Sequence, residues 1–147
     1  MLDDEAIDAA LLAVLDHARV RRAVLLAIGF DAQAVLWFAA RHPERTAGVI
    51  AMSTTPKLVR SDDHPIGMDR HFIERWLSSI DPSVDSAPVP FTDLLAPSLS
   101  DDSAFTRWLF DVGRHSARPD TARRYLQIAA GADVRADVAA IRAPVLV

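Results

Sequence analysis

The stretch that decides the fold is VLLAIGFDAQAVLWFAARHPERT, which runs from Val24 to Thr46. A continuous apolar run, Ala23–Gly29, leads directly into a helical pattern at Phe30–Arg41, and Pro43 prevents that helix from continuing. A short apolar run of this kind is typical of a parallel strand that is covered on both faces. We therefore predict a strand, a tight turn and a helix.

The rest of the chain continues this alternation. Apolar residues at helical spacing predict a helix at Leu2–His17, and a second apolar run predicts a strand at Ala47–Ser53. The other predicted elements are helices at Met68–Ile80, Asp102–His115 and Asp120–Ala130, a helical turn at Val134–Ile141 and a third strand at Pro144–Val147. This order indicates an α/β fold with a short parallel sheet of about three strands and a helical insertion.

These elements suggest a single truncated domain over residues 1–147. Its core of helix, strand, helix and strand covers residues 1–53, a cap-like helical insertion covers 54–131, and residues 132–147 return to the core. Parallel sheets usually have more strands than three, so we expect the middle of a larger fold. Open sheet edges then favour a homo-oligomer or a partner chain.

The composition narrows the function classes. The chain has 147 residues, of which 50% are hydrophobic and 24% charged, and this balance indicates a globular protein. A net charge of -4 without a basic cluster argues against nucleic-acid partners, and the absence of cysteine excludes disulfides and thiolate catalysis. The acidic N-terminal segment does not resemble a secretion signal, and no apolar run is long enough for a membrane span. We expect a cytoplasmic protein without a cofactor or a membrane partner.

Several segments together carry a resemblance to a known family. They are VRRAVLLAIG, FAARHPERTAGVIAMST, IGM before the insertion helix, LAPSLSDD, and ADVRADVAAIRAPVLV. On these segments, which cover nearly the whole chain, the protein resembles the α/β-hydrolase fold family. It is most similar to the hydrolase-like domain found N-terminal to class III adenylate cyclase domains in actinobacterial proteins. The resemblance implies a partial α/β-hydrolase fold with a helical cap insertion.

The same resemblance locates the position where a hydrolase would carry its nucleophile. Family members place a serine in G-x-S-x-G on a sharp strand-to-helix turn, about fourteen residues before the proline of the H-P-E-R segment. Here that position is Gly29, followed by Phe30, and the flanking glycines are replaced by Ala27 and Asp31. Gly29 retains the ability to adopt a positive φ. We therefore expect a degenerate domain without hydrolase activity, with a role in ligand sensing or protein association.

The alternative is a divergent hydrolase, either esterase-like or using Asp31 as its nucleophile, that acts alone or is completed by another chain. Asp31 lies two residues beyond the nucleophile position, and an acid at a helix N-terminus is the competing interpretation. Ser53, Thr54 and Thr55 follow the second strand, where hydroxyl residues usually serve as caps or turn residues.

Two further groups of side chains suggest binding sites. The segment SDDHPIGMDRH contains acids and histidines, namely Asp62, Asp63, His64, Asp69 and His71. It has no pair of histidines at helical spacing, so we expect a solvated loop and no metal site. Large aromatic residues on the insertion helices would either form core or line a pocket for a small lipophilic ligand; they are Phe72, Trp76, Phe105, Trp108 and Phe110.

Overall fold

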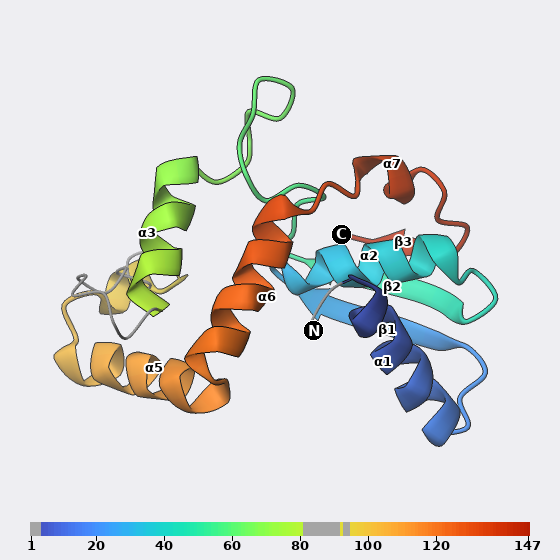
Figure 1. Ribbon diagram of the computed structural model, residues 1–147, viewed down its shortest axis with the longest axis horizontal. Coiled ribbons are helices and arrows are strands. Elements are labelled where there is room, and N and C mark those ends of the chain that lie inside the picture. The colour runs from blue at the N-terminus through green and yellow to red at the C-terminus, as the bar shows by residue number, and fades with distance from the viewer. Residues whose placement is uncertain (1–3, 81–91, 93–94) are drawn as a thin grey trace. The chain divides into compact units, whose positions relative to one another are not determined.

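The computed structural model describes residues 4–80, 92 and 95–147, and it divides the chain into two compact units (Figure 1). The sheet unit comprises Met1–Asp69 and Ile128–Val147, and the helical unit comprises Arg70–Gln127. This grouping places residues 54–69 and 128–131, which the sequence assigns to the cap-like insertion, in the sheet unit.

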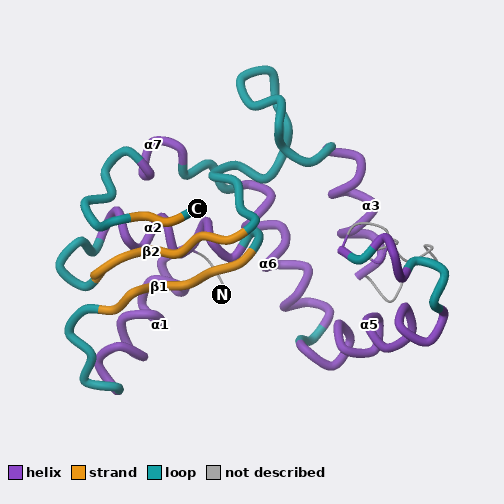
Figure 2. Tube along the Cα trace, turned by 180° about the vertical axis from the view of Figure 1, so that it is seen from behind, coloured by secondary structure: helices purple, strands orange, loops and turns teal. Residues whose placement is uncertain are grey.

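The predicted three-stranded parallel sheet is confirmed. Strands β1 (Ala23–Ile28), β2 (Thr46–Met52) and β3 (Val145–Leu146) lie in that order, and both neighbouring pairs are parallel (Figure 2). Leu26 of β1 pairs with Ile50 of β2, and Ile50 pairs with Leu146 of β3. Side chains of these three residues therefore share one face of the sheet.

Helix α2 (Asp31–Arg41) covers the opposite face and forms the core with it. The core cluster consists of Ala27, Ala32, Leu36, Ala39, Val49, Ala51 and Val134, the last of which directly precedes the short helix α7 (Arg135–Val138). Helix α1 (Asp4–His17) contacts α2, and Asp8 Oδ2 lies 2.8 Å from His42 Nε2 at the end of α2. Residues Leu2 and Asp3 of the predicted first helix lie outside the described residues.

The expectation that the sheet is covered on both faces is wrong for the described part of this unit. In Figure 2 the strands face the viewer, and α1 and α2 lie behind them. Val24, Leu26 and Ile28 are more than half exposed, at 61%, 59% and 56%. The apolar run predicted the strand correctly, but its apolar residues on this face have no helix of the unit packed against them.

The helical unit confirms the predicted helices with small shifts at their ends. It contains α3 (Arg70–Ile80), the 3-10 helix η1 (Pro97–Leu99), α5 (Ser103–Ser116) and most of α6 (Pro119–Gly131). Asp102 caps α5, because its Oδ1 accepts hydrogen bonds from the backbone N–H groups of Ala104 and Phe105 at 2.9 and 3.0 Å. This local side-chain bond fixes where α5 begins.

Candidate functional site

The turn between β1 and α2 has the backbone shape of the sharp strand-to-helix turn that carries the nucleophile in hydrolases. We call this turn, at residues 27–31, the elbow. Gly29 has φ of +66°, and its N–H donates to Met52 O at 2.9 Å, which ties the turn to the end of β2. A Cβ built on Gly29 would meet no atom within 4 Å, so the space for a nucleophilic side chain is open. The position nevertheless carries no functional group.

The other elbow residues lie at the end of β1 and at the start of α2. Ala27 is buried in the core, Phe30 directly precedes α2, and Asp31 is the first residue of α2 and is exposed. A carboxylate in the first helical turn is stabilised by the positive end of the helix dipole. The location of Asp31 therefore has a structural explanation that requires no catalysis.

A hydroxyl and an imidazole meet just beyond β2, but their polarity is wrong for nucleophilic catalysis. Thr55 Oγ1 donates to Lys57 O at 2.8 Å and lies 3.1 Å from Nε2 of the buried His64. Because the hydroxyl proton is already engaged by a carbonyl, Nε2 is the donor to Oγ1 in this pair. An activated nucleophile would instead donate its proton to the imidazole. Ser53 has φ of 49° and serves as a turn residue, as the sequence predicts for this hydroxyl group.

Asp63 of the SDDHPIGMDRH segment forms ion pairs with two basic side chains. Asp63 Oδ2 lies 2.7 Å from Arg135 Nη2, and Asp63 Oδ1 lies 3.3 Å from Lys57 Nζ. Arg135 Nη2 also lies 2.6 Å from Asp133 Oδ2, which is 3.5 Å from Lys57 Nζ. Within the described part of the chain, no three acids, histidines or cysteines are arranged to hold a metal ion. The segment is better explained by charge pairing with residues distant in sequence.

Hydrogen bonding within this cluster shifts the protonation of its members. Hydrogen bonds from Ser61, Arg135 and Lys57 hold the pKa of Asp63 well below its usual range. Hydrogen bonds from Arg135 lower the pKa of Asp133 in the same way, and the two carboxylates raise the pKa of the guanidinium. Asp63, Asp133 and Arg135 therefore remain charged throughout the physiological pH range.

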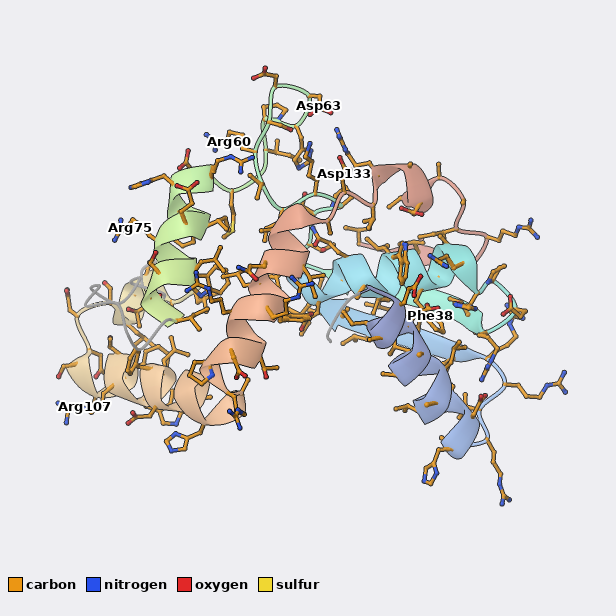
Figure 3. The ribbon with its side chains drawn as sticks, viewed as in Figure 1. Phe38, Arg60, Asp63, Arg75, Arg107 and Asp133 are labelled. Carbon is orange, nitrogen blue, oxygen red and sulfur yellow. The ribbon has the colours of Figure 1, made fainter. Side chains whose placement is uncertain are left out.

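The aromatic residues of the helical unit form one edge-on and one tilted ring pair, but they do not enclose a pocket in its described residues. The ring centroids of Phe72 and Trp76 are 6.4 Å apart, and those of Phe105 and Trp108 are 5.7 Å apart. Trp108 is 58% exposed and lines a shallow, open depression along α5, together with Arg107. Figure 3 labels Arg107 on this helix. The expectation that these aromatics form core is wrong for Trp108 and Phe110, both of which are exposed.

The comparisons with known proteins give one distant relative. No protein-family model matches the chain. The sequence is similar to the biotin biosynthesis bifunctional protein BioHC of Cellvibrio japonicus (strain Ueda107), with 28% identity over 137 residues. The match covers 93% of this chain and 27% of that protein, so the chain spans about a quarter of its relative's length. This likeness supports an α/β-hydrolase-like relationship, in agreement with the sheet.

Sequence reasoning missed two features of the sheet unit. One is the bare aliphatic face, which the apolar run does not distinguish from a covered one. The other is the cluster of Lys57, Asp63, Asp133 and Arg135, whose members come from distant parts of the chain.

Across the residues that the structure describes, no helix combines the length and the apolar character needed to cross a membrane.

Proposed function

We propose that this chain is a non-hydrolytic α/β-hydrolase-like module that associates with a second copy of itself through the bare side of its sheet. We name this side the aliphatic face. It is formed by Val24, Leu26, Ile28, Ile50, Met52 and Leu146. The observation that carries the proposal is that five of these six side chains are about half exposed or more, while Ala27, Val49 and Ala51 on the other face are buried.

The chemistry of the aliphatic face favours association. Its six side chains are all uncharged and apolar, so covering them buries no unpaired charge. Exposed contiguous apolar patches typically mark interaction surfaces, and each large aliphatic side chain contributes about 1.5–3 kcal/mol when it becomes fully buried. A partner that covers this face therefore gains free energy without a compensating electrostatic cost.

A second copy satisfies the geometry of this face. Two sheets pack face to face at a spacing of about 10 Å, with their inner side chains interdigitating. A two-fold dimer brings the same surface patch of both copies together, so each aliphatic face would be covered by its counterpart.

The lack of hydrolysis follows from the elbow and from the hydroxyl groups around it. Gly29 has no side chain at the nucleophile position, and the Thr55 hydroxyl donates to a carbonyl group. The resemblance to domains that accompany class III adenylate cyclases supports a role in association or ligand sensing, and the aliphatic face favours association.

Sedimentation equilibrium tests the association directly. We expect the wild-type chain to form a dimer at roughly tens of micromolar. Leu26→Lys should raise the dissociation constant of this dimer at least about tenfold, because a charge would be buried in the interface. Val14→Lys is the matched control, since Val14 is 65% exposed on α1 and lies outside the face. A wild-type chain that stays monomeric, or an equal effect of the control, would contradict the proposal.

Hydrolysis is tested separately with short-chain aryl esters. We expect the purified chain to show no turnover above the buffer rate, because neither Gly29 nor Thr55 supplies an activated nucleophile. Asp31→Asn and Thr55→Val should leave this baseline unchanged. Turnover that disappears in Asp31→Asn would support the divergent hydrolase instead.

A further inference from the structure

The segment between β2 and α3 is an ordered strap, which we define as residues 54–68. Its two arms are joined by backbone hydrogen bonds, from Arg60 N to Met68 O at 2.8 Å and from Met68 N to Leu58 O at 2.7 Å. At its tip, the N–H and C=O groups of Ser61 and His64 pair with each other at 3.1 and 2.9 Å. Its buried residues are Leu58, Val59, His64 and Gly67. The strap is therefore a folded element of the sheet unit.

The strap packs against the beginning of α2. Gln33, in the first turn of α2, is only 3% exposed. In the amide orientation that satisfies both of its ends, Gln33 accepts from Leu58 N at 3.1 Å and donates to Ala129 O at 3.0 Å. Val134 N also donates to Pro56 O at 2.9 Å. The base of the strap therefore covers the start of α2, at the edge of the sheet where the parallel strands end.

The tip of the strap is held by charges. We name Lys57, Asp63, Asp133 and Arg135 the latch. Figure 3 shows Asp63 on the looped strap and Asp133 on the segment that follows α6. Arg135 donates to the Asp63 carbonyl oxygen at 3.1 Å and to its carboxylate at 2.7 Å, while Asp133 Oδ1 accepts from Arg135 Nε at 2.8 Å. Ser61 Oγ adds a bond of 2.6 Å to Asp63 Oδ1.

We propose that the latch is a salt-sensitive catch that holds the strap closed over the start of α2. Asp63 lies on the segment that leaves the sheet unit, and Asp133 lies on the segment that returns to it. Breaking the contacts of Arg135 therefore frees the tip of the strap without unpairing a strand. The latch side chains are partly exposed to solvent, and the Debye length falls to about 3 Å at 1 M salt, which is close to the separation of the paired atoms. Ligands of parallel α/β sheets bind at the carboxyl ends of the strands. We therefore expect release of the tip to loosen the cover that the base of the strap forms at that edge.

Hydrogen exchange of the strap amides tests the latch in the full chain. We expect Arg135→Gln to lower the protection factors of the Arg60, Ser61, His64 and Met68 amides about fivefold, with the β2 amides unchanged. Raising the salt to about 1 M should produce most of the same loss in the wild type and little further loss in Arg135→Gln. Arg142→Gln is the matched control, because Arg142 is exposed on the same returning segment outside the latch.

A second pair of variants separates the latch from general destabilisation. Asp63→Asn should have a similar effect, and combining it with Arg135→Gln should add less than the sum of the two. Equal acceleration of exchange in β2, or wild-type exchange in Arg135→Gln, would overturn the proposal. These variants leave the aliphatic face intact, so a failure here is distinct from a failure of self-association.

Discussion

Two positions in the sheet unit favour glycine over residues that have a Cβ atom. Gly29 adopts a positive φ at the elbow, while Gly67 sits where the two arms of the strap come close. The resemblance to the hydrolase family locates Gly29, because family members place the nucleophile about fourteen residues before the proline that Pro43 matches. Gly67 carries no comparable sequence signal, since the close approach depends on how the strap folds back on itself.

Replacing Gly29 tests the elbow conformation. Gly29→Ala should reduce the free energy of unfolding by about 1–2 kcal/mol, because the space is open but the left-handed conformation disfavours a Cβ. Urea denaturation measures this loss. Gly131→Ala, at the end of α6 with no neighbour within 4 Å, is the control and should be neutral or slightly stabilising. Equal stability of the two variants would contradict the elbow geometry.

Gly67→Ala tests the packing of the strap. Its Cβ would lie 2.5 Å from Arg60 N and 2.7 Å from Val59 C, so the backbone of one arm must shift. We expect a loss of about 1–3 kcal/mol, as for other overpacked sites, with faster hydrogen exchange concentrated in the strap. A variant with wild-type stability and exchange would show that the arms are not held this closely.

At the element scale, the start of α5 depends on one side chain. Asp102→Ala removes the acceptor for two backbone N–H groups and should destabilise the helical unit by about 1 kcal/mol. Thermal unfolding followed by circular dichroism measures the effect. The neighbouring exposed Asp101→Ala provides the control and should change little. Identical losses in the two variants would show that the cap does not hold α5.

The latch makes a prediction about pH. Because the pKa values of Asp63 and Asp133 are lowered in the folded state, their stabilising effect is present above the ordinary carboxylate pKa of about 4. It is lost as the pH falls through the lowered values. Strap protection factors, corrected for intrinsic exchange, should therefore stay constant between about pH 5 and pH 8 and fall only in strong acid. A midpoint near neutrality would show that the two latch carboxylates do not control the strap.

The elements themselves were largely predictable from the sequence. Apolar runs marked β1 and β2, and the local signals of Pro43 and Asp102 marked where helices end or begin. The latch was not predictable, because Asp63 and Arg135 are 72 positions apart and charged residues in a polar segment have no local pattern that reveals a partner. The same limit explains why the segment at 54–69 was assigned to the insertion and not to the sheet unit.

At the scale of the whole molecule, the bare sheet face is the feature that most constrains function. The run at Ala23–Gly29 is apolar on both sides of the strand, and this indicates that both sides are suited to burial. The sequence does not tell whether a helix of the same unit or another molecule supplies the cover. The structure places α1 and α2 on one side only, and the aliphatic face follows from that arrangement (Figure 2).

Site-specific crosslinking tests the central claim most directly, because the chain has no cysteine and a single one can be introduced at a chosen position. A bismaleimide that spans about 10 Å matches the spacing of two packed sheets. The account predicts a covalent dimer from Leu26→Cys, at concentrations where the wild type dimerises, and little from Val14→Cys on α1. Equal yields from the two variants, or a Leu26→Cys chain that stays monomeric under the reagent, would contradict association through the aliphatic face.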